Sequence, residues 1–142
     1  MPQLFFVPNL DDQVDHCDLD QERSHYMCRV MRLETGAKIM AFDGDAKIFS
    51  ATNKSAKPRP AKLSVDALLS LEERNKNEIA IGLSLIKGGA MDRAIAQATE
   101  LGVQRIILLQ SDRSNVSLKK ERMDKKIAHL KKGAISSLEQ SG

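Results

Sequence analysis

The stretch Ile79-Ala80-Ile81-Gly82-Leu83-Ser84-Leu85-Ile86 decides the fold class of this chain. Its nearly continuous apolar run is typical of a strand in a parallel sheet that is covered on both faces. Lys87-Gly88-Gly89 follows as a turn, apolar residues recur at helical spacing over residues 91–101, and Gly102 ends the helix. Residues 105–109 form a second apolar run. A strand, a helix and a strand within about 30 residues predict a parallel βαβ unit.

The remainder of this half predicts one more helix and an unfinished sheet. The helix is expected to begin near Ser117, because apolar residues recur on one stripe of it: Ile127, Leu130, Ala134 and Leu138. Parallel sheets usually have several strands and helices on both faces, whereas residues 78–142 supply few elements of either kind. We therefore expect this sequence to be the front portion of a longer protein, or to be completed by association.

The amino-terminal half begins with a short strand, which we place at Leu4–Val7. The acidic stretch that follows is expected to form an exposed loop. Asp20 is a good N-cap for a helix that runs to about Arg32, with Tyr26 and Val30 spaced to face a core.

A β pattern follows this helix. Apolar runs flank Asp43-Gly44, a strong signal for a tight turn, so residues 39–51 predict a β-hairpin. A third alternating run covers residues 63–67. We therefore predict a largely β domain over residues 1–75 and an α/β domain over residues 76–142.

Length and composition narrow the class of protein. The 142 residues suit one medium domain or two small ones. The longest apolar stretch is far shorter than the roughly 20 residues that span a bilayer, and the amino end lacks the features of a secretory signal. We expect no membrane association and a cytoplasmic location. The three His and two Cys are scattered, so we predict no metal site.

The positive charge is concentrated in two segments. Residues 23–62 carry nine basic and three acidic residues, a net charge of +6, and residues 113–132 carry eight and two, again +6. Such segments can neutralise nucleic-acid phosphates. The alternative is that the basic side chains are merely solvated, as surface lysines commonly are.

Three cations of the first segment are candidate RNA contacts. Arg29 and Arg32 lie one turn apart in the predicted helix, so they share a face and could grip a phosphate backbone. A plainly solvated pair is an equally good interpretation. Lys54 lies in the polar stretch after the hairpin.

Glu100 and Arg113 are the candidate residues for chemistry. Glu100 lies in the last turn of its helix, where a carboxylate is unfavourable unless a cation offsets it, and Arg105 or Arg113 could supply that cation. Alternatively, the carboxylate orients an arginine or accepts a hydrogen bond from a substrate. Arg113 follows the carboxyl end of a parallel strand, where α/β sheets usually bind ligands.

Several short motifs occur in a fixed order along the chain: His25-Tyr26-Met27-Cys28-Arg29-Val30-Met31-Arg32, Gly36, Phe42-Asp43-Gly44, Lys87-Gly88, Ala98-Thr99-Glu100-Leu101-Gly102-Val103, Asp112-Arg113-Ser114 and Glu139-Gln140-Ser141-Gly142. Their order and spacing resemble the bacterial 16S ribosomal RNA uridine-N3 methyltransferase family, ribosomal RNA small subunit methyltransferase E. The segment Thr99–Val103 before a strand, followed by the acid-Arg-Ser loop, is the most diagnostic element.

The resemblance implies a PUA-like β-barrel over residues 1–75 that holds RNA, followed by the incomplete first part of a SPOUT α/β knot domain over residues 76–142. It implies methylation of uridine N3 in 16S ribosomal RNA of the small subunit, with S-adenosylmethionine as methyl donor, by a homodimer. The family's donor-binding loop has no counterpart here, so the cofactor pocket is expected downstream of Gly142.

By position, the resemblance carries Arg29 and Arg32 to the RNA side of the first domain, and carries Glu100 and Arg113 near the catalytic cleft. Lys54 is a candidate RNA contact by its charge and its place in the polar stretch. It assigns no general base. Two other functions stay open. One is a non-catalytic RNA-binding module, and the other is a small α/β domain that binds a nucleotide at the turn Lys87-Gly88-Gly89.

Overall fold

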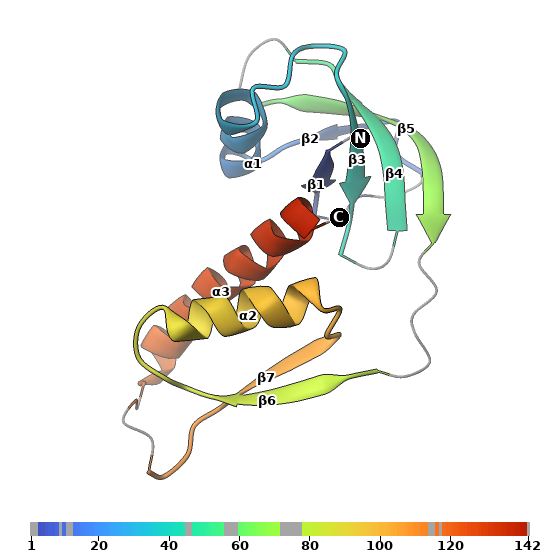
Figure 1. Ribbon diagram of the computed structural model, residues 1–142. Coiled ribbons are helices and arrows are strands. Elements are labelled where there is room, and N and C mark those ends of the chain that lie inside the picture. Colours follow the sequence, from blue (N-terminus) through green and yellow to red (C-terminus); the bar gives the residue numbers. More distant parts are fainter. Residues whose placement is uncertain are drawn as a thin grey trace. The chain divides into compact units, whose positions relative to one another are not determined.

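A computed structural model shows two compact units, residues 1–74 and 75–142, which we describe one at a time (Figure 1). The structure describes residues 3–8, 10, 13–44, 47–55, 60–71, 78–113, 116 and 118–141. Of the helices in this described part, none is both long enough and apolar enough to cross a bilayer.

The first unit is built on a five-stranded sheet in the order β1-β3-β4-β5-β2. Its strands are β1 (Leu4–Phe6), β2 (His16–Asp18), β3 (Lys38–Phe42), β4 (Lys47–Asn53) and β5 (Lys62–Leu71). β1 runs parallel to β3, and the other pairs are antiparallel. Among the described residues, β1 and β2 are the two edges, so the sheet forms a curled half-barrel, a part of the PUA-like β-barrel that we expected (Figure 1).

The predicted hairpin is confirmed, and one strand was missed. β3 and β4 pair across the Asp43-Gly44 turn, and Gly44 takes a positive φ of 88° that favours glycine there. β2 lies in the acidic stretch that we expected to be a loop. Only Cys17 of its three residues is partly buried, so the stretch carries almost no apolar alternation.

The predicted helix is correct at its start and wrong at its end. α1 (Gln21–His25) begins after Asp20, whose Oδ1 accepts a hydrogen bond from the backbone N–H of Arg23 at 2.7 Å, as an N-cap should. The chain then continues as a π-helix, η1 (Tyr26–Val30). The wider turn shifts side chains off the α-helical spacing, and Val30 is 59% exposed instead of buried.

The core of the first unit lies between the sheet and α1–η1. Phe5, Met27, Ile39, Phe49 and Leu63 are its largest fully buried apolar side chains. A buried hydroxyl links the two layers, because Ser24 Oγ donates to the carbonyl of Leu19 at 3.1 Å and accepts from the N–H of Ala61 at 3.0 Å.

The second unit confirms the predicted βαβ unit. β6 (Ala80–Ser84) and β7 (Arg105–Leu109) are parallel and in register, and α2 (Ala90–Glu100) connects them. α3 (Lys120–Ser141) follows. Its predicted start near Ser117 falls on a residue outside the described ranges.

The carboxyl end of α2 closes as the glycine predicts. Gly102 has a φ of 77°, and the N–H groups of Val103 and Gly102 donate to the carbonyls of Ala98 and Thr99 at 3.0 and 2.9 Å. This pattern is a Schellman motif. It turns Leu101 away from the core, and Leu101 is 84% exposed although its spacing predicted burial.

Within the described residues, the β6–β7 sheet is covered on one face, whereas the apolar run predicted two covered faces. Both strands alternate exposed and half-buried residues. α2 and α3 pack on the same face through Ile95 and Leu130, against Leu83, Ile106 and Leu108 (Figure 1). On the other face, Ile107 and Leu109 are 47% and 46% exposed.

Candidate functional site

A buried amide organises one surface of the first unit. Asn53 ends β4 and is fully buried. Its Nδ2 donates to the carbonyls of Leu33 and Glu34 at 3.1 Å each, and its Oδ1 accepts from the N–H of Ser55 at 2.9 Å. One side chain therefore fixes the segment directly after Arg32 to the segment that contains Lys54.

Arg29 and Arg32 flank the end of the π-helix, and both are exposed. Our prediction that they share one face of an α-helix is wrong. Arg29 belongs to η1, whereas Arg32 lies beyond its C-cap with a φ of 54°. π-helical turns and non-glycine residues with a positive φ are both uncommon, and both are enriched at functional sites. The backbone conformation at the end of η1 therefore favours a functional role for Arg29 and Arg32.

Lys54 lines a polar pocket of about 400 Å³ together with His16, Asp18 and Lys62. The backbone N–H of Lys54 donates to the carbonyl of Lys62 at 2.9 Å, so the two lysines come from paired chain segments. Lys62 Nζ lies 3.8 Å from Asp18 Oδ1 in an exposed ion pair. Two ammonium groups thus share a pocket with one carboxylate, which favours an anionic ligand.

The sequence alone identified neither Asn53 nor Lys62 as part of this surface. The sequence did contain a signal that Asn53 is buried, because it lies on the same face of the strand as the buried residues Phe49 and Ala51. A buried amide must find hydrogen-bond partners. Lys62 could not be found, since its position depends on how β4 and β5 pair.

The contacts of two aromatic rings in this unit favour a surface that binds phosphates over one on which bases stack. Phe5 and Tyr26 stack on each other with centroids 6.2 Å apart, and the guanidinium of Arg23 lies 4.1 Å from the Phe5 ring centroid. These rings are therefore engaged within the unit. Guanidinium and ammonium groups bind phosphate oxygens through charge-assisted hydrogen bonds and carry no sequence information of their own.

The structure does not bring Glu100 and Arg113 together. Glu100 is the last residue of α2, which leads into the amino end of β7, whereas Arg113 follows the carboxyl end of β7. A strand of this length is about 16 Å long. Arg113 is exposed at the sheet edge where α/β proteins bind ligands, and Glu100 lies toward the opposite edge. Ser114, the third residue of that motif, lies outside the described ranges.

Arg105, one of the two cations expected to offset Glu100, has another partner. Arg105 Nη2 lies 3.2 Å from Glu78 Oε2. Within the residues that the structure describes, the exposed carboxylate of Glu100 forms no ion pair. It therefore remains in an unfavourable position at the negative end of the α2 dipole.

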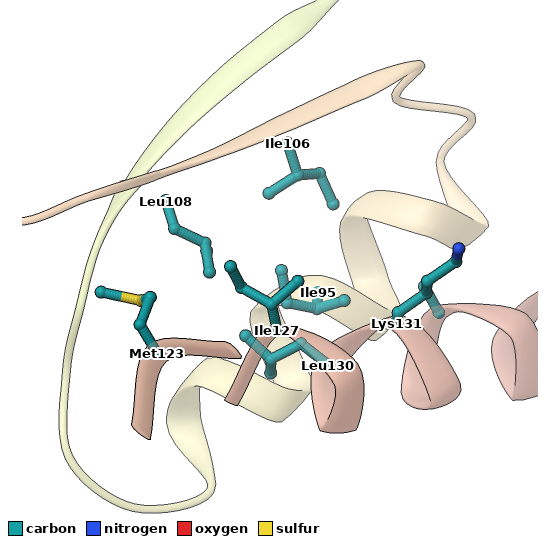
Figure 2. A pocket seen from close by; sticks show the side chains of 8 residues that line it. Ile95, Ile106, Leu108, Met123, Ile127, Leu130 and Lys131 are labelled. Atoms are coloured by element: carbon teal, nitrogen blue, oxygen red, sulfur yellow. The ribbon is translucent and has the colours of Figure 1, made fainter. Parts of the chain in front are cut away.

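An apolar cavity of about 450 Å³ lies between β7, α2 and α3 (Figure 2). Ile106 and Leu108 point into it from the strand, and Ile95, Ile127 and Leu130 line it from the helices, with the ammonium of Lys131 at its rim. None of its lining residues is a carboxylate, an imidazole or a hydroxyl. The cavity can shelter an apolar group, but its side chains cannot accept a proton or hold a metal.

The thiols are unreactive by environment. Burial raises the pKa of Cys17, and the neighbouring Asp18 adds to the rise, while a backbone hydrogen bond with Leu63 acts in the opposite direction. Burial also raises the pKa of Cys28, against a smaller lowering by Arg29. Both thiols are therefore protonated at neutral pH. The described part of the chain contains no group of three or more metal-ligating residues.

Comparison with known proteins identifies both units. Residues 19–66 match the family model described as the RNA methyltransferase PUA domain, and residues 73–142 match the RNA methyltransferase domain. The two matches indicate the class of RNA methyltransferases that carry a PUA domain. Within this class, the chain is similar to proteins named ribosomal RNA small subunit methyltransferase E.

The relatives match most or all of the chain. Ribosomal RNA small subunit methyltransferase E 2 of Borreliella burgdorferi is 27% identical over 123 residues, which are 87% of this chain and 50% of the relative. The Neisseria gonorrhoeae ribosomal RNA small subunit methyltransferase E, bound to S-adenosyl methionine, is 26% identical with a TM-score of 0.89, over 100% of this chain and 58% of the other.

A methyltransferase of Legionella pneumophila in complex with the cofactor SAM is 25% identical with a TM-score of 0.90, over 100% of this chain and 59% of the other. The chain therefore spans about half the length of the curated relative and less than two thirds of these two structures.

Proposed function

We propose that this chain supplies the RNA-binding unit and the opening βαβ unit of an S-adenosylmethionine-dependent methyltransferase that acts on uridine N3 in 16S ribosomal RNA of the small subunit. The observation that carries the proposal is the coincidence of two family matches with a preorganised cationic surface on the PUA-matching unit. In this proposal the second unit begins a SPOUT-type domain, the enzyme is a homodimer, and it works in the cytoplasm.

The RNA-binding part of the proposal rests on Arg29, Arg32 and Lys54. The first two are exposed at the end of η1, and Asn53 fixes the segment after Arg32 to the segment of Lys54. An interface held by hydrogen bonds loses little conformational entropy when it binds. These cations position the RNA through its phosphates, and Lys62 joins them in the pocket of Lys54.

The chemistry requires an accessible base. Uridine N3 is a weak acid on the base-pairing edge, so the base must be unpaired or turned out, and its proton must be lost. Of the two catalytic candidates, Arg113 lies at the ligand-binding edge of the sheet, where a guanidinium can hold a phosphate or the uridine carbonyls. Glu100 lies toward the other edge, so we assign it no contact within the site of Arg113, and we assign no general base.

The apolar cavity of the second unit does not fit the methyl donor. S-adenosylmethionine carries a sulfonium cation, an amino-acid carboxylate and ribose hydroxyls. The cavity in Figure 2 offers apolar side chains and one ammonium group, Lys131, which repels a cation and leaves the hydroxyls without acceptors. We therefore derive no step through the donor from the described residues.

The second candidate function is a non-catalytic RNA-binding module, which the cationic pocket of the first unit would also serve. Calorimetric titration of this chain with S-adenosylmethionine tests the module. Tight binding of the donor would exclude it, whereas RNA binding without donor binding agrees with both candidates, because the first places the donor pocket outside this chain.

The RNA interface is tested with the double variant Arg29→Gln/Arg32→Gln and a labelled RNA hairpin of mixed sequence. Lys47→Gln/Lys131→Gln is the matched control, because it also removes two positive charges. Lys47 is at the opposite end of β4 from Asn53, and Lys131 is on the other unit. We expect the first variant to weaken binding about tenfold and the control less than about twofold. Equal affinities of the two variants would remove Arg29 and Arg32 from the interface.

A further inference from the structure

α3 carries a stripe of cationic side chains that no site described so far uses. With 3.6 residues per turn, five side chains fall within an arc of about 120°. They are Arg122, Lys125, Lys126, His129 and Lys132. Lys126 is half-buried, and the other four are exposed. The apolar side chains of α3 that pack on the sheet lie on a different face, so the stripe remains on the surface.

One carboxylate of α2 holds the middle of this basic stripe in place. Asp92 Oδ1 lies 2.7 Å from Nε2 of His129, and Asp92 Oδ2 lies 3.8 Å from Nζ of Lys126. Glu121 lies at the edge of the stripe on the same helix. Four permanently charged cations beside two carboxylates leave an excess of two positive charges, even with His129 neutral.

The shape of the basic stripe fits a linear polyanion. From Arg122 to Lys132 it runs ten residues, or about 15 Å along the helix axis. A row of cations on a rigid helix matches the regular row of phosphates along a nucleic-acid strand. Anchoring by Asp92 reduces the side-chain entropy that binding would otherwise cost.

An anionic membrane is the less suitable partner. Helices that bind membrane surfaces insert an apolar face beside their cationic one. In α3 that face is partly occupied, because Leu130 is 4% exposed and packs with Ala134 in the core of the second unit, whereas Ile127 is 46% exposed. The basic stripe itself contains no large apolar side chain.

We propose that the basic stripe on α3 binds the phosphate backbone of the RNA substrate, as a second contact surface separate from the one on the first unit. This inference rests on the proposed function, since it assumes an RNA partner. It gives the second unit a role in holding RNA that does not depend on its ability to bind the methyl donor.

The test uses the 142-residue chain, a labelled RNA hairpin of mixed sequence and fluorescence anisotropy. Arg122→Gln/Lys125→Gln should weaken binding about tenfold, and the slope of log affinity against log salt should fall by about 0.7 for each lost contact. Lys47→Gln/Lys131→Gln should change the affinity less than about twofold. Asp92→Asn should strengthen binding, because it removes a negative charge from the stripe.

The outcomes separate this inference from the proposed function. Unchanged affinity in Arg122→Gln/Lys125→Gln, with weakened affinity in Arg29→Gln/Arg32→Gln, overturns the stripe and leaves the proposed function standing. No RNA binding by the unmodified chain overturns both. If Arg122→Gln/Lys125→Gln lowers the affinity of the chain for phosphatidylserine vesicles but not for RNA, the stripe binds membranes and the inference is wrong. Circular dichroism of each variant establishes that it is folded.

Discussion

Nε2 of His129 on α3 lies 2.7 Å from Oδ1 of Asp92 on α2, and this contact joins the two helices that cover the β6–β7 sheet. Asp92 also reaches Lys126 at 3.8 Å. The carboxylate therefore stabilises the packing of the helices and at the same time lowers the positive charge of the α3 surface. These two effects have opposite consequences for stability and for RNA binding.

Asp92→Asn should lower stability and raise RNA affinity. Exposed ion pairs contribute about 0.2–1 kcal/mol each, so urea unfolding should show a loss of that order. Anisotropy with the RNA hairpin should show tighter binding at low salt and a difference that shrinks as salt rises. A variant that is both less stable and weaker in RNA binding would contradict the electrostatic role of Asp92.

Arg32→Gly should raise stability and weaken RNA binding. A non-glycine residue with a φ of 54° costs about 1 kcal/mol, which glycine does not incur. Thermal unfolding should show the gain, and anisotropy should show the loss of a phosphate contact. Arg32→Ala is the control, because it removes the same charge and keeps the strain. If Arg32→Ala stabilises the chain as much as Arg32→Gly, the strain is not the cause.

Asn53→Ala should destabilise the first unit by about 2–4 kcal/mol, because three hydrogen bonds are lost and the carbonyls of Leu33 and Glu34 remain without the amide that satisfied them. Urea unfolding measures the loss. RNA affinity at a temperature where the variant is folded should also fall, since Arg32 and Lys54 are no longer held together. Normal affinity in the folded variant would show that Asn53 has no positioning role.

Glu100→Gln should stabilise the second unit by about 0.3–1 kcal/mol, because a negative charge at the carboxyl end of α2 is removed. The gain should diminish at high salt. Urea unfolding at two salt concentrations is the measurement, with Glu34→Gln as a control for the loss of one exposed carboxylate. A loss of stability would reveal a favourable partner for Glu100.

Cys17 should react slowly with a disulfide reagent at neutral pH. Burial and Asp18 raise its pKa, so the thiolate population is smaller than that of an ordinary cysteine and grows only as the pH rises toward the raised value. In a Cys28→Ser background, Asp18→Asn should lower the pKa and speed the reaction. Glu34→Gln should leave the rate unchanged, and equal rates in both variants would exclude the charge of Asp18 as a cause.

The βαβ unit could be predicted because its signals are local. The helical spacing of α2 and the position of Gly102 require no knowledge of distant residues, and the Schellman motif confirms the end of the helix. The burial of the strands could not be predicted. A short apolar run looks the same whether one face of the sheet is covered or both, and Ile107 and Leu109 belong to an open face.

The prediction for the first helix was wrong at its carboxyl end for a different reason. A π-helix has i→i+5 hydrogen bonds in place of the i→i+4 bonds of an α-helix, and no side chain in this segment indicates which pattern forms. The α-helical spacing of Tyr26 and Val30 therefore predicted the wrong face for Val30. The candidate RNA residues were proposed from their charge, and Arg29 and Arg32 also from helical spacing and from the position of their motif. Their link through Asn53 depends on contacts between residues about twenty positions apart in the chain, which only the pairing of the strands determines.

The separation of Glu100 and Arg113 follows from topology that the sequence already contained. In a parallel βαβ unit, the helix runs opposite to the strands, so its last residue and the loop after the second strand must lie toward opposite edges. We expected Glu100 and Arg113 in one cleft because of the order of their motifs, without taking into account the direction in which the chain runs through the helix and the strand.

The open face of the β6–β7 sheet governs how the isolated chain behaves in solution. Ile107 and Leu109 present exposed hydrocarbon to water, and the strands beside them have unpaired edges within the described residues. Such a surface draws molecules together as their concentration rises. Dilute samples, checked by light scattering, are therefore the appropriate condition for every binding measurement on this protein.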